Sequence, residues 1–202
     1  IQILSMGHHL QRNINAGQLF GLENIYDHYL SEGAADRMCA YLKERWEKPG
    51  SRYHVMKEMF ACLHKLEVLS ADWPKKVRHY EKVLFGGGRK QYEALHQYRM
   101  PDKIAEQLLS YFIYVYFAGA VYDGMPYSKV KLAVISTMLI EDMVCAKAAE
   151  KGQLSFEAIA DAAHSYAREV EHSDLNLQRL SIMFRHRKCF HIGRLCGALL
   201  EW

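Results

Sequence analysis

The sequence contains little proline and no cluster of cysteines. Only 4 of its 202 residues are proline, so long helices can run between these breaks. The 5 cysteines are widely spaced, except for the last two, Cys189 and Cys196. An odd number of dispersed cysteines argues against a disulfide framework and predicts reduced thiols in a cytoplasmic protein. No three of them lie close enough along the chain to suggest the ligands of an iron–sulfur cluster.

The sequence also lacks a large excess of positive or negative charge. The 26 Lys and Arg residues nearly balance the 23 Asp and Glu residues, and the formal net charge is +3. This mild excess does not predict binding to nucleic acid. No glycine-rich turn follows a strand pattern, so no doubly wound nucleotide site is predicted. The chain begins at Ile1 without Met and without signal-peptide features, and we interpret it as part of a longer protein.

Helical periodicity fills the sequence instead. Half of the residues are hydrophobic, and apolar positions recur every three or four residues, which indicates amphipathic helices rather than strands. We predict an all-α fold, a bundle of roughly nine to ten helices without a sheet. The run Gly86-Gly87-Gly88 is the clearest break in the pattern. It predicts an N-terminal helical subdomain, residues 1–87, and a C-terminal helical subdomain, residues 88–202, packed as one unit.

Particular residues predict where several helices begin and end. Pro49-Gly50 indicates a helix stop followed by a turn. Ser128 is predicted to cap a long helix that ends before Gly152. Ser155 and Ser173 are predicted to cap the two helices that follow, since a serine hydroxyl can accept a hydrogen bond from a free N–H of the first turn.

The longest uncharged run extends from Gln107 to Tyr122. Its apolar part would span roughly 22 Å as a helix, which is less than the roughly 30 Å core of a bilayer. Hydroxyl groups also dilute the run, at Ser110, Tyr111, Tyr114 and Tyr116. We therefore predict a central helix that is buried on most sides, with membrane contact as the alternative.

Two groups of side chains are candidates for binding or chemistry. The first is a set of tyrosines, whose rings can attract a lysine ammonium or a sulfonium by cation–π interaction, although core packing would use the same residues: Tyr111, Tyr114, Tyr116 and Tyr122. The segment from Arg168 to Asp174 is dense in titratable groups. A histidine beside carboxylates there can act as a general base, and a capped helix junction explains the segment equally well.

The densest basic stretch lies near the C-terminus, at Arg185, His186, Arg187 and Lys188, followed by His191 and Arg194. A solvated helix end explains this stretch, and an anionic partner or lipid headgroups are the alternative. The nearby cysteines and histidines do not have the spacing of a zinc module. We predict no metal site, and interpret the cysteines as buried thiols beside surface histidines.

Four segments between Glu106 and Leu177 carry a family resemblance. They are Glu106-Gln107-Leu108-Leu109-Ser110-Tyr111-Phe112, Tyr122-Asp123-Gly124, Val130-Lys131-Leu132-Ala133-Val134 and Tyr166-Ala167-Arg168-Glu169-Val170-Glu171-His172-Ser173-Asp174-Leu175-Asn176-Leu177. Their order and spacing resembles the C-terminal half of bacterial flagellin lysine-N-methylase. The resemblance covers about residues 100–180, whereas the first hundred residues share only its helical character.

The resemblance implies a methyltransferase fragment. Members of that family transfer a methyl group from S-adenosylmethionine to lysine side chains of flagellin, and their N-terminal half has a cysteine-rich motif for a 4Fe-4S iron–sulfur cluster. None of the 5 cysteines here matches that motif. We therefore expect the C-terminal part of such an enzyme, without a complete catalytic centre and inactive or nearly so alone. Contacts with substrate or cofactor are expected at Tyr111, Tyr114, Arg168, Glu169, His172 and Asp174.

The expected role is to dock substrate, complete the S-adenosylmethionine pocket or mediate assembly in the cytoplasm. The partners are then flagellin and the enzyme's own N-terminal half, with a homo-oligomer and peripheral membrane contact as further options. The alternative is a helical ligand-sensing or dimerisation module without chemistry, for which bundles of this size are also used. An upstream cysteine-rich coding segment would favour the methylase, and an upstream helix-turn-helix would favour a regulator.

Overall fold

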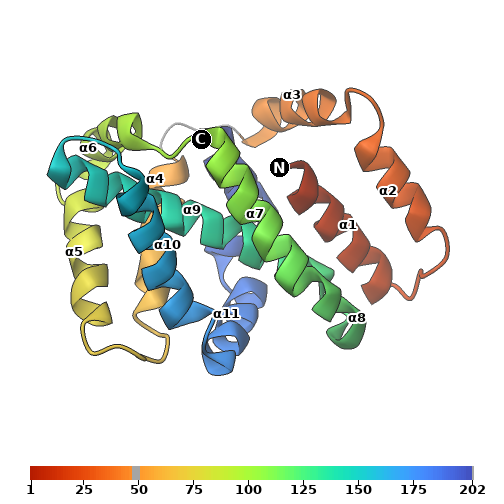
Figure 1. The fold of residues 1–202 in the computed structure, drawn as a ribbon. Helices are drawn as coiled ribbons and strands as arrows, with labels where there is room; N and C mark the ends of the chain where they lie inside the picture. Colours follow the sequence, from red (N-terminus) through yellow and green to blue (C-terminus); the bar gives the residue numbers. More distant parts are fainter. Residues whose placement is uncertain (47–50, 202) are drawn as a thin grey trace.

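The structure is a computed structural model that describes residues 1–46 and 51–201 (Figure 1). Helix accounts for 82% of the chain, and no strand occurs in the described ranges. The described residues form eleven helices of eight residues or more, close to the roughly nine to ten expected. The predicted all-α fold is therefore confirmed. The helix stop predicted at Pro49-Gly50 lies outside the described residues.

The helices follow one another with short connections. The first part of the chain forms α1 (Gln2–Asn15), α2 (Leu22–Leu30), α3 (Ala34–Trp46), α4 (Ser51–Leu63), α5 (Trp73–Phe85) and α6 (Gly88–Leu95). The second part forms α7 (Asp102–Tyr116), α8 (Ala120–Asp123), α9 (Pro126–Lys151), α10 (Phe156–Val170), α11 (Asp174–His186) and α12 (Ile192–Leu200). Single 3-10 turns join some of them, namely η1 (His96–Tyr98), η2 (Phe117–Gly119) and η3 (Lys188–Phe190).

Helix α9 forms the centre of the bundle. It is 26 residues long, and almost every residue from Val130 to Ala146 is buried. Helices α1, α7, α10 and α11 pack against it, and Figure 1 shows it passing behind α7 and α10. Most side chains of a helix surrounded in this way are apolar or small. The buried charges of Lys131, Glu141 and Asp142 are the exceptions, and each has a partner on another helix.

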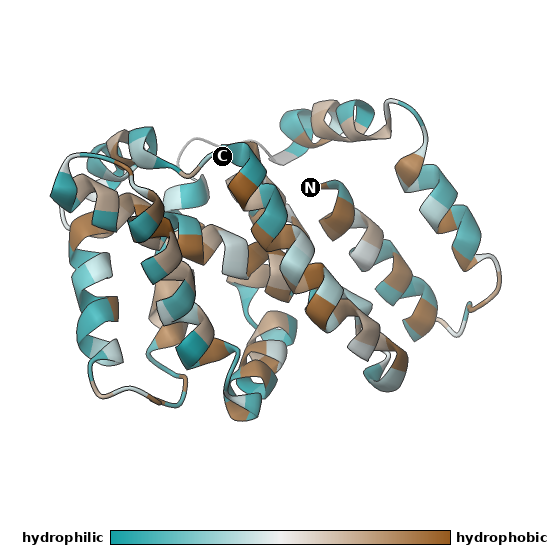
Figure 2. Ribbon diagram, in the orientation of Figure 1, coloured by the Kyte–Doolittle hydropathy of each residue, from teal (hydrophilic) through white to brown (hydrophobic). Residues whose placement is uncertain are grey.

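Helix α7 is not the central helix that the uncharged run predicted. Phe112 is its only residue that is fully buried, and just 6% of the most apolar window of Asp102–Asp123 is buried. One side of α7 packs against α9, while Figure 2 shows hydrophobic residues on the side that faces away. The prediction of burial on most sides is wrong because α9 occupies the centre. By length and composition alone, Asp102–Asp123 is long and apolar enough to cross a membrane.

Most of the predicted helix ends are confirmed. Gly152 ends α9 with a φ of 71°, a left-handed conformation that glycine adopts without strain. The hydroxyls of Ser155 and Ser173 each accept a hydrogen bond from the N–H three residues further along. Ser128 is not a cap, because α9 begins at Pro126, whose fixed φ suits the first turn. Ser128 is instead the third residue of α9, and its side chain is buried.

A charged cluster inside the bundle joins α4, α6 and α9. The Nη2 atom of Arg52 lies 3.0 Å from a carboxylate oxygen of Glu141 and 3.0 Å from one of Asp142. The hydroxyl of Tyr92 donates a hydrogen bond of 2.8 Å to Asp142. The hydrophobic core likewise draws residues from both sides of Gly87, and the division into subdomains at that residue stays a prediction.

Candidate functional site

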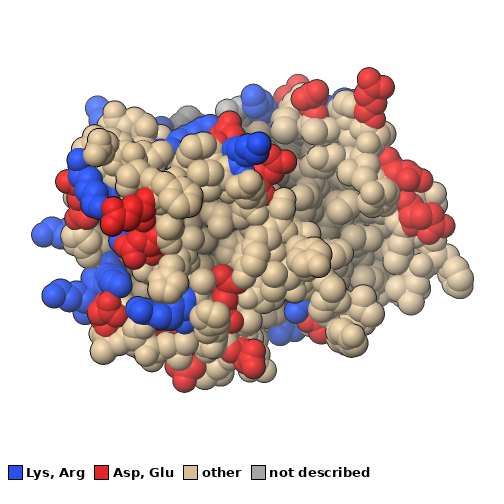
Figure 3. Space-filling model, viewed as in Figure 1, with Lys and Arg blue, Asp and Glu red and all other residues tan. Residues whose placement is uncertain are grey.

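Aromatic and aliphatic side chains are exposed along α7, η2 and α8. The exposed fractions of Tyr114, Val121 and Tyr122 are 88%, 85% and 92%. Tyr111 and Val115 are about half exposed on the same stretch of chain. We call these five residues the aromatic strip. Figure 3 shows that the centre of this face carries few charged atoms, whereas Lys, Arg, Asp and Glu gather toward its edges.

A shallow groove of about 490 Å³ runs along α7 beside the strip. It is lined by Lys103, Glu106, Gln107, Ser110, Tyr111 and Tyr114. The hydroxyls of Tyr111 and Tyr116 both donate to the same oxygen of Glu171, each at 3.0 Å. Burial and this carboxylate raise the pKa of both tyrosines, so both hydroxyls stay protonated and keep donating. The groove thus combines two tyrosine rings with one carboxylate, Glu106, and one cation, Lys103, and a second carboxylate, Glu171, bonds Tyr111 beside it. Tyrosine rings and carboxylates both attract a cation.

The predicted site residues on α10 have structural partners. Glu169 is 1% exposed, and its Oε2 accepts hydrogen bonds from the backbone N–H of Leu69 at 3.0 Å and of Ser70 at 3.2 Å. Its carboxylate therefore holds the loop that precedes α5. Arg168 is partly exposed, and its Nη2 lies 3.6 Å from Asp72. Glu169 therefore faces the protein interior, and Arg168 lies at its edge beside the loop. Neither side chain lines the groove along α7.

The remaining predicted residues lie at the junction of α10 and α11. His172 and Asp174 are exposed there. The junction is held by Ser173, whose hydroxyl donates to Glu67 at 3.0 Å, and by Asn176, whose amide donates to two backbone carbonyls. These contacts fit the capped-junction interpretation of the segment. The structure thus brings the Tyr-rich helix and this segment together through Glu171, which the sequence interpretation did not select.

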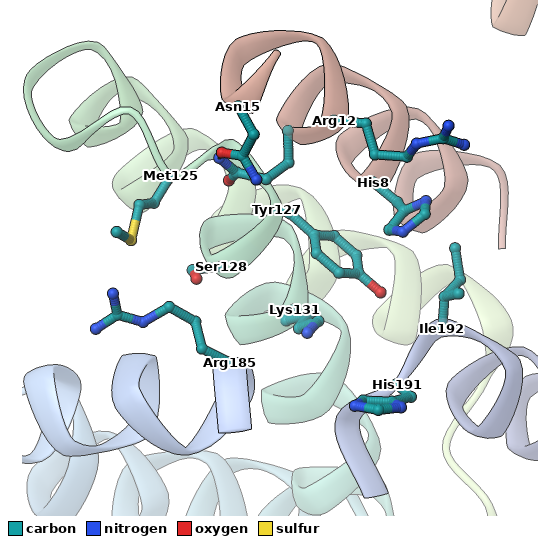
Figure 4. A pocket seen from close by; sticks show the side chains of 11 residues that line it. His8, Arg12, Asn15, Met125, Tyr127, Ser128, Lys131, Arg185, His191 and Ile192 are labelled. Carbon is teal, nitrogen blue, oxygen red and sulfur yellow. The ribbon is translucent and has the colours of Figure 1, made fainter. Parts of the chain in front are cut away.

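A second cavity lies elsewhere, between α1, α9, the end of α11 and the start of α12. Its volume is about 600 Å³, and Figure 4 shows the side chains around it. The lining residues are His8, Gln11, Arg12, Asn15, Met125, Tyr127, Ser128, Lys131, Arg185, His191 and Ile192. We call this space the basic cavity, because its lining includes Arg, Lys and His but neither Asp nor Glu.

Lys131 lies at the base of the basic cavity and is only 5% exposed. Its Nζ donates a hydrogen bond of 2.7 Å to the carbonyl of Phe184 and lies 4.1 Å from the centre of the Tyr127 ring. Burial lowers the pKa of Lys131 to about 8. Burial, together with the neighbouring cations Arg12 and Lys131, also lowers the pKa of His8. Burial is thus the main reason why both side chains bind protons less readily, and nearby cations add to the effect at His8.

Sequence interpretation did not find the basic cavity. Arg185 and His191 belong to the basic stretch already noted near the C-terminus, but Lys131 lies in an apolar helix and His8 and Arg12 lie near the other end of the chain. Only the packing of α1 and α11 against α9 brings these residues together. The available signal was that Lys131, together with Lys129, precedes an uncharged stretch of α9 that runs from Leu132 to Ile140.

Of the two cofactors implied for the family, the iron–sulfur cluster lacks ligands among the described residues. No group of three or more His, Cys, Asp or Glu side chains that could hold a metal occurs there, and all 5 cysteines are included. The basic cavity is a poor match for S-adenosylmethionine, because its cations would repel the sulfonium and the ammonium of that molecule and attract only its carboxylate.

The fold and these sites define an all-helical domain that has, within residues 1–46 and 51–201, neither a nucleotide-binding sheet nor a metal centre. A family model described as the FliB lysine N-methylase C-terminal domain matches residues 1–198, and the chain belongs to this family. The match extends well beyond residues 100–180, where the resemblance was recognised, and includes α1 to α6. No curated protein and no solved structure matches the chain.

Proposed function

We propose that this chain is the flagellin-docking domain of a lysine N-methylase and that it does not transfer methyl groups alone. Membership of the FliB lysine N-methylase C-terminal domain family supports the reaction class. The observation that carries the docking role is the exposed aromatic strip on α7 to α8, beside a groove with carboxylates. Large exposed apolar patches of this kind mark interaction sites more often than ordinary surface.

The groove has the chemistry to receive a lysine side chain. The faces of Tyr111 and Tyr114 can each attract an ammonium by roughly 0.5–1 kcal/mol at an exposed site. Glu106 in the groove and Glu171 beside it supply negative charge, each worth about 1 kcal/mol or less in water. Contacts of this size give weak docking, which suits a protein substrate that must leave after modification.

The catalytic groups then belong to another part of the methylase. The described cysteines are too dispersed for a cluster, and the basic cavity repels a sulfonium. We therefore propose that the methyl donor and the cluster are held by the N-terminal half of the enzyme. In this arrangement flagellin binds to the aromatic strip of this chain. The lysine to be methylated then extends toward the N-terminal half of the enzyme.

Calorimetric titration of flagellin into the chain tests the docking role. We expect the double substitution Tyr114→Ala and Tyr122→Ala to weaken binding roughly tenfold, since two ring contacts of about 0.7 kcal/mol each are lost. Tyr26 and Tyr41 are also exposed, by 58% and 56%, but lie on α2 and α3. Their double substitution by alanine is the matched control and should change the affinity less than twofold.

Equal loss of affinity in the two double variants would contradict docking on the strip. Incubation of the isolated chain with flagellin and S-adenosylmethionine, followed by mass spectrometry of flagellin, tests the second part of the proposal. We expect no added methyl groups. Methylation by the isolated chain would show that it contains a catalytic centre and would overturn the division of labour.

A further inference from the structure

We propose that the basic cavity between α1, α9, α11 and α12 binds the phosphate group of an organic ligand. This inference goes beyond flagellin docking and does not depend on it, because the basic cavity and the α7 groove share no lining residue. Figure 4 shows His8, Tyr127, Lys131 and His191 grouped together, with the guanidinium groups of Arg12 and Arg185 directed to opposite sides of this group.

The first argument is uncompensated charge. Arg12, Lys131 and Arg185 reach the cavity from three different helices, and none of the lining residues is a carboxylate. A lining with several cations and no carboxylate favours an anion over a cation in this space. A phosphate monoester carries close to two negative charges and several oxygens, so it can contact Lys131 and a rim arginine at the same time.

The second argument is the environment of Lys131. An ammonium has three N–H donors, and here one bonds the carbonyl of Phe184 while the ring of Tyr127 covers another side. The hydroxyl of Tyr127 is buried and has no hydrogen-bond partner in the described part of the chain. Buried hydroxyls are normally satisfied, so this one is an available donor at the wall of the cavity.

The third argument is the size and the remaining lining of the cavity. A volume of about 600 Å³ is far larger than a phosphate ion and lies within the range of small-molecule sites. Met125, Ile192 and the ring of Tyr127 provide apolar walls for an organic group attached to the phosphate. His8 packs edge-on against that ring, with 5.1 Å between the ring centres, and completes the wall.

A purely structural role accounts for only part of this arrangement. Lys131 satisfies a carbonyl in the last turn of α11, as basic residues near helix C-termini often do. That role explains neither the two exposed arginines at the rim nor the unpartnered hydroxyl of Tyr127. The test therefore changes the arginines and leaves Lys131 in place, so that the fold is not at risk.

The experiment is calorimetric titration at pH 7 and low salt with three probes, inorganic phosphate, phenyl phosphate and phenol. We expect phenyl phosphate to bind, inorganic phosphate to bind more weakly, and phenol not to bind. The double variant Arg12→Gln and Arg185→Gln should bind phenyl phosphate at least tenfold more weakly. The matched control is Lys75→Gln with Arg78→Gln, two exposed cations on α5 that lie outside the cavity lining. It should change the affinity less than twofold.

Vesicles of phosphatidylglycerol and of phosphatidylcholine distinguish a lipid headgroup from a free phosphate ester. The site would be assigned to a lipid if the protein sediments with phosphatidylglycerol vesicles but not with phosphatidylcholine vesicles, and if the Arg12 and Arg185 variant does not sediment with either. Binding of phenyl phosphate without sedimentation would assign it to a soluble ligand. Absence of both, or equal weakening in the variant and its control, would overturn the proposal.

Discussion

Arg52 and Asp142 form an ion pair that is almost completely removed from solvent. The guanidinium Nη2 lies 3.0 Å from Oδ1 of Asp142, and the two side chains are 2% and 0% exposed. Tyr92 donates to the second oxygen of the same carboxylate. Burial and the charge of Asp142 raise the pKa of Tyr92 well above its ordinary value, so this donor stays protonated. The pair connects α4 to the central helix α9.

We expect Asp142→Asn to lower the free energy of unfolding by roughly 2–3 kcal/mol, because Arg52 and Tyr92 lose buried hydrogen bonds to a charged acceptor, while Glu141 still pairs with Arg52. Urea unfolding followed by circular dichroism measures the change. Asp161→Asn is the control, since Asp161 is exposed and pairs with Lys147 at the surface. That change should cost about 1 kcal/mol or less. Losses of equal size would show that the buried pair contributes no more than a surface pair.

Gly7 lies where α1 packs tightly against α9. A Cβ atom added at this position would lie 2.9 Å from Cγ2 of Val130. We therefore expect Gly7→Ala to destabilise the protein by about 1–3 kcal/mol through overpacking. Gly119→Ala is the control, because the nearest atom there, Cε of Lys129, is at an ordinary 3.5 Å. Adding Val130→Ala to Gly7→Ala should recover part of the loss, and a further large loss would contradict the overpacking account.

The stability of the protein should depend on pH through Lys131. Its pKa is about 8 in the folded protein against 10.5 in the unfolded chain, so between these values the unfolded state binds more protons. Stability contributed by this residue therefore rises with pH in that window. The groups that face Lys131 are His8 and Arg12 from α1, Arg185 from α11, and Cys189 and His191 beyond it.

We expect the free energy of unfolding of the native protein, relative to Lys131→Met, to increase by roughly 2 kcal/mol between pH 7.5 and pH 9.5. Chemical unfolding of both proteins at several pH values measures the difference, and subtraction removes the titration of other groups. A difference that stays constant or falls with pH would show that Lys131 is not held at a lowered pKa.

The thiol of Cys62 should ionise more readily than an ordinary cysteine. Its pKa is lowered by a hydrogen bond from Cys189 and by the guanidinium of Arg187. The Nη1 atom of Arg187 lies 3.1 Å from the Cys62 sulfur. We expect Arg187→Gln to raise this pKa by about one unit, because a cation next to the thiolate is lost. Ultraviolet titration of thiolate, with Cys62→Ser subtracted, measures it. Arg179→Gln, which removes an arginine that bonds a carbonyl instead, should leave the pKa unchanged.

Short-range features of the fold could be predicted from the sequence. The end of α9 at Gly152 and the caps at Ser155 and Ser173 were predicted from their own neighbourhoods and are confirmed. The prediction for Ser128 was wrong because Pro126, two residues earlier, is a stronger start signal. The family was also recognised from local motifs, and the family match confirms it.

Burial was harder to predict than secondary structure. Helix α7 and helix α9 are both largely apolar, and composition favoured α7 as the central one. Glu169 was expected to be available to a substrate, yet its carboxylate binds the backbone of a loop about 100 residues earlier in the chain. Neither outcome is visible in a helical pattern, because the pattern shows which sides are apolar but not which surface covers them.

The amino-acid sequence alone determined that this protein is helical, where most of its helices end, and to which family it belongs. Helices and their ends depend on hydrogen bonds and caps between residues at most four or five positions apart, and the family depends on sequence motifs alone. Only the tertiary structure decided that α9 is central, that Tyr111 meets Glu171, and that Arg12, Lys131 and Arg185 surround one cavity. Those contacts join distant segments, and they arise from how whole helix surfaces fit together during packing.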